Sequence, residues 1–365
     1  MPKAKPIMFP TRLSLWILPL VVWATNLGVP RGTAAKESPL SRILFGSCVK
    51  QDQPVPILQS IVEREPDLFL FLGDNIYADT TDLDLMRAKY AKLASDAGFA
   101  KLLRTCPLMA TWDDHDYGVN DGGAEYPQRA GSQQVFVDFW GDPAASPRRQ
   151  RPGVYDAKRF GPPGKRLQVI LLDTRYFRGP LQTGARRVGG PYVPSDDPQV
   201  TMLGEPQWVW LEEQLRKPAE VRIIASGIQC ISEAAGHETW ANLPHERQRL
   251  FDLIAKSRAN GVLILSGDRH WAELSVQKQA VPYPIYDLTS SSLNQIHPRG
   301  TPTNNRHRAA ATTYHRENFG EIFIDWKADD PNLQLRILDI DGQVVLESAI
   351  RLSQLRAAAA PVPGR

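Results

Sequence analysis

The stretch Leu68-Phe69-Leu70-Phe71-Leu72-Gly73-Asp74-Asn75 joins five large apolar residues to a glycine and an aspartate. A short apolar run bounded by turn residues is typical of a strand that is buried on both faces of a sheet. Gly73 and Asp74 then fall at the carboxyl end of this strand. In open α/β sheets, ligands bind at that edge. The stretch therefore predicts a parallel sheet with a polar side chain at its functional edge.

The same pattern recurs along the chain. Short aliphatic runs are found at Ile43–Phe45, Leu68–Leu72, Leu108–Thr111, Val169–Leu172, Val221–Ala225 and Val262–Leu265. Between them, four segments are expected to be amphipathic helices: Pro54–Arg64, Leu83–Ser95, Pro206–Lys217 and His245–Arg258. Alternating strands and helices predict an α/β protein in which many strands pair in parallel.

The pattern changes after Tyr283. Four consecutive strands are predicted at Ile285–Thr289, Glu321–Asp325, Leu333–Leu338 and Val344–Ile350. Asp341-Gly342 lies between the last two and predicts a β-hairpin. We expect these strands to form a second, more antiparallel sheet that packs against the first. Two stretches rich in Pro, Gly and Arg are expected to be long loops near the functional site: Gly141–Arg166 and Gly179–Gly204.

The first 35 residues differ from the rest. Basic residues at Lys3, Lys5 and Arg12 precede an apolar stretch, and Thr33-Ala34-Ala35 follows it. This arrangement is typical of a secretory signal peptide with a small-residue cleavage site. The alternative is a membrane anchor, but the apolar stretch is shorter than the roughly 20 residues that a spanning helix needs.

These features predict an organisation and a location. We expect residues 1–35 to be a signal peptide, 36–356 to be one catalytic domain and 357–365 to be a flexible tail. The mature protein is expected to be a monomer without a transmembrane anchor, exported to the periplasm or the extracellular space.

Composition excludes several classes of protein. The formal net charge is +3, and the first 35 residues hold four basic residues and no acidic one. The remainder is almost neutral, so we expect no stable nucleic-acid partner. A hydrophobic content of 42% is too high for a disordered chain. Three cysteines are too few for a disulfide-stabilised small scaffold, and whether Cys106 and Cys230 pair is left open.

Four of the predicted strands end in residues that can bind metal ions. If these strands are neighbours, their carboxyl ends bring six side chains to one rim: Cys48, Asp74, Asp114, His115, Asp268 and His270. Carboxylates that are crowded together resist ionisation unless a cation neutralises them. The set therefore indicates a metal site, with more than one ion.

Each of these residues also has a simpler explanation. A single aspartate after a strand is often only the N-cap of the next helix. Cys48 could be a small buried hydrophobic residue. It could also form a nucleophilic pair with a histidine, although Asp74, Asp114 and Asp268 would then have no role.

Several motifs in this order resemble those of a known family. Gly73-Asp74-Asn75-Ile76-Tyr77 matches the GDxxY element of purple acid phosphatases. The further landmarks are Gly46-Ser47-Cys48, Trp112-Asp113-Asp114-His115-Asp116, Asp173-Thr174-Arg175, Ser226-Gly227-Ile228-Gln229, Trp240-Ala241-Asn242, Ser266-Gly267-Asp268-Arg269-His270 and Asn318-Phe319-Gly320. From about Arg42 to Trp326, the chain resembles the alkaline phosphatase D (PhoD-like) family of the calcineurin-like metallophosphoesterase superfamily.

The resemblance implies a fold and a role for each matching residue. The fold would be a four-layer α/β/β/α sandwich of two mixed sheets flanked by helices. Asp74 would bridge two metal ions, the first of which would also bind Cys48, Tyr77 and His270. The second ion would bind Asp114, Asp268 and Asn120, and His115 would lie beside the substrate phosphate. Asp268 occupies a position where the superfamily usually has a histidine, which leaves the identity of the second metal open.

The chemistry of these ligands predicts which metals they hold. A thiolate, a phenolate and an imidazole around one ion favour Fe³⁺, because lowering the pKa of both Tyr77 and Cys48 requires a highly charged centre. The oxygen ligands of the second site favour a hard cation, with Ca²⁺ as the first choice. The second choices are Zn²⁺, Mn²⁺ and Mg²⁺.

Three further residues are candidates for substrate contacts. Arg175 could bind a phosphate oxygen through its guanidinium, as a substrate-binding and catalytic residue, or could pair with Asp173 instead. Gln229 and His237 could line the pocket and hold the leaving group. Histidines in such positions are more often surface or capping residues.

The expected function is that of an exported metal-dependent phosphoesterase. A metal-bound hydroxide would attack a phosphomonoester or phosphodiester in line, and His115 would stabilise the developing charge or protonate the leaving group. The resemblance favours an enzyme able to cleave diesters. The alternative is a non-catalytic cell-surface module that calcium stabilises, and a third possibility is a hydrolase with Cys48 as its nucleophile.

Overall fold

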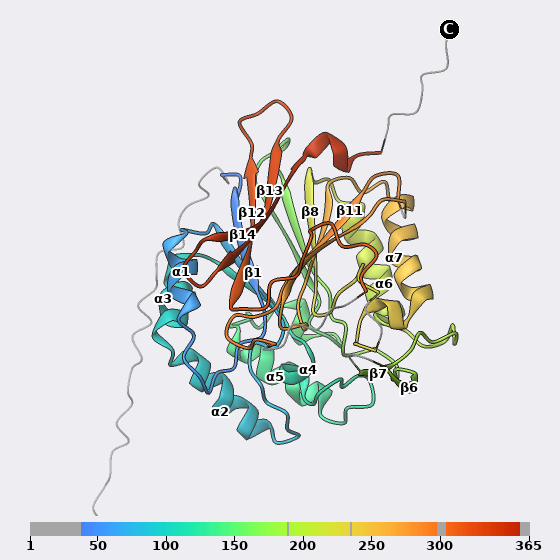
Figure 1. Ribbon diagram of the computed structural model, residues 1–365. Helices are drawn as coiled ribbons and strands as arrows, with labels where there is room; N and C mark the ends of the chain where they lie inside the picture. The colour runs from blue at the N-terminus through green and yellow to red at the C-terminus, as the bar shows by residue number, and fades with distance from the viewer. Residues whose placement is uncertain (1–37, 188–189, 234–235, 280, 298–303, 358–365) are drawn as a thin grey trace, which may run out of the picture. The chain divides into compact units, whose positions relative to one another are not determined.

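The computed structural model describes residues 38–187, 190–233, 236–279, 281–297 and 304–357. Two six-stranded sheets pack face to face, and helices cover the outer faces of both (Figure 1). The expected four-layer α/β/β/α sandwich is confirmed. The segment 1–35 and nearly all of 357–365 lie outside the described residues, so the signal peptide and the flexible tail stay predictions.

The first sheet has the strand order β14-β13-β12-β1-β2-β3. Three of its strands are parallel: β1 (Arg42–Gly46), β2 (Leu68–Leu72) and β3 (Leu108–Thr111). The other three are antiparallel to their neighbours: β12 (Asn318–Asp325), β13 (Asn332–Asp339) and β14 (Val344–Arg351).

The second sheet has the order β10-β11-β9-β8-β5-β4. Its four central strands are parallel: β5 (Leu167–Leu171), β8 (Val221–Ser226), β9 (Val262–Ser266) and β11 (Ile285–Ser290). Its two edge strands are antiparallel to their neighbours: β4 (Asp156–Phe160) and β10 (Ala272–Gln277). A separate hairpin consists of β6 (Thr183–Arg187) and β7 (Gly190–Tyr192).

The helices lie in two groups. Around the first sheet are α1 (Ile57–Glu63), α2 (Leu83–Ala94), α3 (Ala97–Thr105), α4 (Asp114–Tyr117) and α5 (Arg129–Phe139). The second sheet is covered by α6 (Gly204–Leu215) and α7 (Pro244–Lys256) (Figure 1). Short 3-10 turns occur at Pro147–Arg149, Trp240–Asn242 and Leu352–Leu355.

Strand β2 contributes to two hydrophobic cores, one on each face of its sheet. Leu68, Leu70 and Leu72 pack between the two sheets, whereas Phe69 and Phe71 pack against the helices. Side chains of a strand alternate between its faces, and all five are buried. An apolar residue at every position is therefore what a strand between two covered faces requires.

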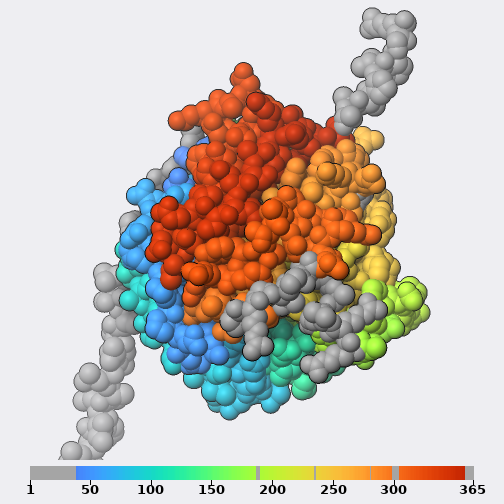
Figure 2. All heavy atoms as spheres, in the orientation of Figure 1, coloured from blue at the N-terminus to red at the C-terminus, as the bar shows by residue number. Residues whose placement is uncertain are grey.

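The expectation that the C-terminal strands form a sheet of their own is wrong. Strand β12 pairs antiparallel with β1, with Ile322 opposite Ile43, and it brings β13 and β14 into the first sheet. Strand β11 instead pairs in parallel with β9 in the second sheet. Gly320 permits the first pairing, because a Cβ atom there would lie 2.0 Å from the ring of Phe45. In Figure 2, β12, β13 and β14 belong to the red part of the surface.

The predictions for the turns, loops and cysteines are confirmed only in part. The hairpin between β13 and β14 is confirmed, and Gly342 has a positive φ of 74°. The two expected loops are not free of regular structure, because Gly141–Arg166 contains β4 and Gly179–Gly204 contains the β6–β7 hairpin. All three cysteines are free and buried. Within the described ranges, we find no helix with the length and hydropathy to cross a membrane.

Candidate metal centre

The predicted ligands lie at the carboxyl ends of strands from both sheets. Cys48, Asp74 and Asp114 follow β1, β2 and β3 of the first sheet, whereas Asp268 and His270 follow β9 of the second. The expectation that four neighbouring strands of one sheet carry them is therefore wrong. The two sheets meet at this edge, where the Thr111 hydroxyl donates to the Leu172 carbonyl at 2.7 Å.

The backbone of the ligand loops is unusual. The φ angles are 63° at Cys48, 49° at Asp74, 70° at Asp268 and 57° at His270. Left-handed backbone at residues other than glycine is uncommon, costs free energy and is concentrated at functional sites. Four such residues in one place indicate that the backbone adopts a less stable local conformation, which directs these side chains toward one another.

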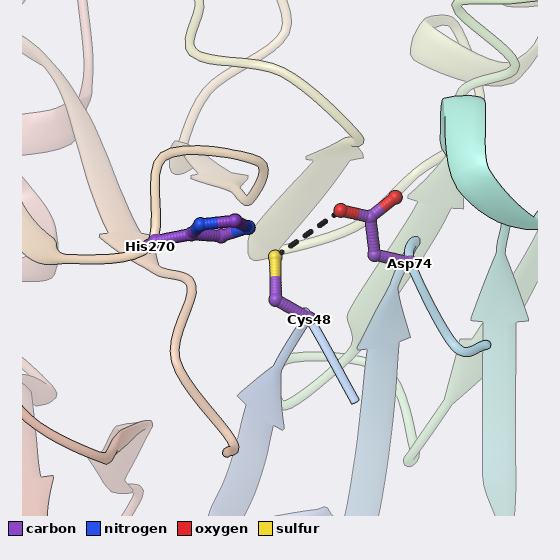
Figure 3. A group of neighbouring side chains, drawn as sticks. All are labelled: Cys48, Asp74 and His270. Carbon is purple, nitrogen blue, oxygen red and sulfur yellow. Dashed lines mark hydrogen bonds between the residues drawn. The ribbon is translucent and has the colours of Figure 1, made fainter. Parts of the chain in front are cut away.

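The first group of ligands contains a thiol, a carboxylate and an imidazole. Cys48, Asp74 and His270 each offer one atom within 4.8 Å of the others (Figure 3). The Cys48 sulfur lies 3.3 Å from Asp74 Oδ2. Tyr77 completes the group, since its hydroxyl lies 2.9 Å from His270 Nε2 and 3.4 Å from Asp74 Oδ2.

The second group is built from carboxylates. Asp74, Asp113, Asp114 and Asp268 offer oxygen atoms within 4.8 Å of one another. Asp74 belongs to both groups and also to a third one with Asp114 and His115. Its Oδ1 atom is buried and accepts no hydrogen bond from the described residues.

Arg175 pairs with Asp113 and Arg269 pairs with Asp268, but Asp74 has no ion pair among the described residues. Burial, together with the charges of Cys48 and Asp114, raises the pKa of Asp74 well above its ordinary value. Burial also raises the pKa of Asp268 to about 6. At Asp114, burial acts in the same direction, but the charges of Arg175 and His115 and other contacts outweigh it, and the net effect lowers the pKa. A polyvalent cation would allow all these carboxylates to ionise, so the residues fit a metal ion.

The protonatable ligands of the first group, Cys48 and Tyr77, are also disfavoured as anions when no metal is bound. Burial raises the pKa of the Cys48 thiol to about 11, and it raises the pKa of Tyr77 well above its ordinary value. Without a metal, Cys48 is a neutral thiol at pH 7, which argues against a nucleophilic thiolate. Burial lowers the pKa of His270 to about 4, so its imidazole is neutral and able to bind a metal.

His115 has a partner that sequence reasoning missed. Its Nδ1 atom lies 2.7 Å from Asp79 Oδ1, and its ring lies 4.2 Å from the ring of Tyr77, between centroids. Burial lowers the pKa of His115, but the hydrogen bond to Asp79 and the charge of Asp114 outweigh this and raise it. Asp79 lies two residues after Tyr77, but nothing in the sequence pairs it with His115.

Asp116 is a second residue that sequence reasoning missed. Its side chain is fully buried, and it accepts the backbone N–H of Asp113 at 2.7 Å and that of Asp74 at 3.2 Å. It also accepts the side-chain amide of Asn75 at 2.5 Å and the hydroxyl of Tyr90 at 3.3 Å. One carboxylate therefore joins the loop after β2 to the loop after β3, and each loop carries a candidate ligand.

A cavity of about 220 Å³ opens beside these ligands. Among the residues that line it are Asp114, His115, Asn120, His237, Asp268 and His270. Asn120 and His237 thus line the cavity, and their roles as metal ligand and leaving-group contact stay predictions. A larger cavity, of about 640 Å³ and lined largely by apolar side chains, lies between the edge strands β3 and β4 and contains none of the predicted site residues.

Arg175 and Gln229 do not line the ligand cavity. Arg175 is fully buried, with Nε 2.6 Å from Asp113 Oδ1 and Nη1 2.7 Å from Glu238 Oε2. The expected contact with Asp173 is made by the Arg175 backbone N–H and not by the guanidinium. The amide of Gln229 donates to the Thr289 hydroxyl inside the core. Neither side chain can therefore contact a substrate in this cavity. The prediction was based on their positions in the motifs, and those positions do not show that both side chains are buried.

The chain is similar to known proteins over most of its length. A family model described as PhoD-like phosphatase matches residues 44–330. Alkaline phosphatase D of Bacillus subtilis (strain 168) is 24% identical over 277 residues, which cover 64% of this chain and 47% of that protein. The chain spans about half the length of this curated relative.

Solved structures share the fold. The structure of PhoD matches with a TM-score of 0.68 and 18% identity, covering 89% of this chain and 73% of that one. A dimetal phosphatase from Danio rerio matches with a TM-score of 0.50 and 11% identity, covering 86% of this chain and all of that one. At these identities, the likeness concerns the arrangement of sheets and helices.

Proposed function

Because the chain belongs to the PhoD-like phosphatase family, we propose that it is a metal-dependent phosphoesterase that hydrolyses phosphomonoesters, phosphodiesters or both. One observation carries this proposal. Asp74 is shared by three groups of potential ligands, and one of its buried oxygen atoms has no protein donor. A carboxylate in this position is suited to bridge two cations.

We assign the ligands as follows. Cys48, Asp74, Tyr77 and His270 would hold the first ion, for which Fe³⁺ is the best fit because deprotonating both the buried thiol and the buried phenol requires a highly charged centre. Asp74, Asp114, Asp268 and Asn120 would hold the second, for which Ca²⁺ fits the oxygen donors best. When bound, the ions neutralise the phosphoryl oxygens and lower the pKa of a water molecule so that it can attack phosphorus.

His115 would supply the proton chemistry. It lines the cavity, and the contact with Asp79 fixes its ring and favours the protonated form. A protonated imidazole can stabilise negative charge on the phosphoryl group and donate a proton to the leaving alkoxide. His237, which also lines the cavity, would contact the leaving group.

Arg175 has a different role from a substrate contact in this proposal. With Arg178, it holds Glu238, which lines the cavity, and it also holds Asp113 within the carboxylate group. Its buried positive charge lowers the free energy of ionised carboxylates nearby. We further propose that the protein is a monomer and that it is exported, the latter on the basis of the signal-peptide pattern in residues 1–35.

Hydrolysis of chromogenic phosphate esters, measured before and after chelation, tests this function. We expect activity to disappear when the metals are removed and to return when Fe³⁺ and Ca²⁺ are added. A protein that unfolds on chelation but never hydrolyses an ester would instead be a calcium-stabilised module. Activity that resists chelators and is abolished by thiol alkylation would identify Cys48 as a nucleophile.

A further inference from the structure

Arg269 lies between two of the candidate ligands, Asp268 and His270, in the loop after β9. Its side chain is 12% exposed and lines the ligand cavity. The Nη1 atom lies 3.0 Å from Asp268 Oδ2 and 3.2 Å from the Glu238 carbonyl. The guanidinium carbon lies 5.5 Å from the centre of the Trp271 ring. These contacts hold the guanidinium at the wall of the cavity.

Arg269 lines the ligand cavity and carries a permanent positive charge. Among the described residues that line the cavity, there is no other arginine and no lysine. The two arginines behind the wall, Arg175 and Arg178, are buried and engaged with Glu238. Both contacts of the Arg269 guanidinium use Nη1. Among the described residues, Nη2 makes no hydrogen bond or ion pair, so it can donate to a ligand in the cavity.

The two classes of phosphate ester differ in what they offer such a donor. A monoester has three non-bridging phosphoryl oxygens and a diester has two, since the third is esterified. Arginine binds phosphoryl oxygens through charge-assisted hydrogen bonds. An esterified oxygen carries little charge and brings a carbon substituent, which leaves a buried donor unpaired.

We propose that Arg269 donates to a phosphoryl oxygen that is free in a monoester and esterified in a diester, so that this site prefers monoesters. This inference rests on the proposed function. The sequence resemblance alone favours an enzyme able to cleave diesters, and this inference ranks monoesters above them. It also gives the positively charged substrate contact to Arg269 in place of Arg175, whose guanidinium is buried against Asp113 and Glu238.

Substitution of Arg269 tests the inference through a ratio of activities. In Arg269→Gln, we expect kcat/KM for p-nitrophenyl phosphate to fall by about 10- to 100-fold, which corresponds to the loss of charged hydrogen bonds. For bis(p-nitrophenyl) phosphate, we expect a change of less than about threefold. Arg269→Lys keeps the charge and should recover part of the monoester activity. A loss of metal lowers both activities, so the ratio reports on the phosphoryl contact.

Calorimetry provides a second readout that does not depend on turnover. Inorganic phosphate should bind to metal-loaded Arg269→Gln about 10-fold more weakly than to the wild type, whereas dimethyl phosphate should bind equally to both. Arg149→Gln is the matched control, because Arg149 is also partly buried and paired with one aspartate, Asp138, but does not line the cavity. It should behave as wild type in both measurements.

The outcomes separate this inference from the proposed function. A wild type that prefers the diester, or an Arg269→Gln variant that loses both activities equally, would show that Arg269 only holds Asp268, and the inference would be wrong. If the wild type hydrolyses neither ester, the proposed function is wrong. In that case, equal phosphate binding by wild type and variant would overturn the inference as well.

Discussion

His115 Nδ1 lies 2.7 Å from Asp79 Oδ1; Asp79 belongs to the loop after β2, and His115 belongs to α4, which follows β3. The contact leaves Nε2 as the ring nitrogen that is available for the substrate. It also favours the protonated imidazole, because the carboxylate stabilises the positive charge. A histidine held in this way is suited to act as a general acid.

Replacing Asp79 should therefore change the pH profile. In Asp79→Asn, the pKa of His115 should fall, so the decline of kcat on the alkaline side should begin at a lower pH. We expect kcat at neutral pH to decrease by about 10- to 100-fold while the metal content stays unchanged. Steady-state kinetics across pH, with metal analysis of the same samples, checks this. An unchanged profile would rule out a role for Asp79 in the titration of His115.

Replacing Asp116 should loosen the connection between two ligand loops. Asp116→Asn preserves the shape but places an amide where the protein presents only donors, so several hydrogen bonds are lost. We expect the free energy of unfolding to fall by about 1–3 kcal/mol and metal affinity to fall with it. The control is Asp138→Asn, an exposed residue of α5. Equal metal affinity in Asp116→Asn and wild type would contradict this prediction.

In the metal-free protein, the contribution of Asp268 to stability should be lost as pH rises. Asp268 has a pKa of about 6 in the folded chain and an ordinary value of 3.8 when unfolded, so the folded state holds its proton more tightly. Its stabilisation is complete below pH 3.8 and is lost as pH rises through about 6. Asp74, whose pKa is also raised, acts in the same direction.

Thermal unfolding with and without chelator checks this dependence. The Tm of the chelated wild type, relative to that of chelated Asp268→Asn, should decline between about pH 4 and pH 7, because the amide does not titrate. The Tm gain on adding metal to the wild type should grow over the same range. A Tm difference between the two chelated proteins that stays constant over this range would contradict the electrostatic account of the site.

The ligands of the first ion should give the protein a colour. A ferric ion bound to the Tyr77 phenolate and the Cys48 thiolate should show charge-transfer absorption in the visible range. Tyr77→Phe should lose part of this absorption and keep the fold, because the ring remains. The visible spectrum and iron content, measured together, check this. An active protein that is colourless and free of iron would point to Zn²⁺ or Mn²⁺.

The strands and most ligands could be predicted because their signals are local. Leu68–Leu72 and Val262–Leu265 are unbroken apolar runs, and both are strands with a ligand at their carboxyl end. The pairing of β12 with β1 joins residues nearly 280 positions apart and depends on the space that Gly320 leaves for Phe45. No local pattern reveals such a contact, so the sequence does not show that β12, β13 and β14 belong to the first sheet.

Ligands that stand within a sequence motif could be predicted, whereas residues whose roles depend on contacts in the folded chain could not. Asp74 and Asp268 follow apolar strands, and they do converge on one group. Asp79 and Asp116 act through His115 and Asp74, and only the folded chain shows those contacts. Arg175 was misassigned because its position in a motif does not reveal that Asp113 and Glu238 surround its guanidinium.

Metal content per chain, measured in the purified wild type and in Asp74→Ala, tests the central claim most directly. We predict at least two ions per chain in the wild type, with iron and calcium both present, and the loss of both ions together with ester hydrolysis in Asp74→Ala. If Asp74→Ala keeps its ions and its activity, Asp74 does not bridge a metal pair, and the proposed centre is wrong.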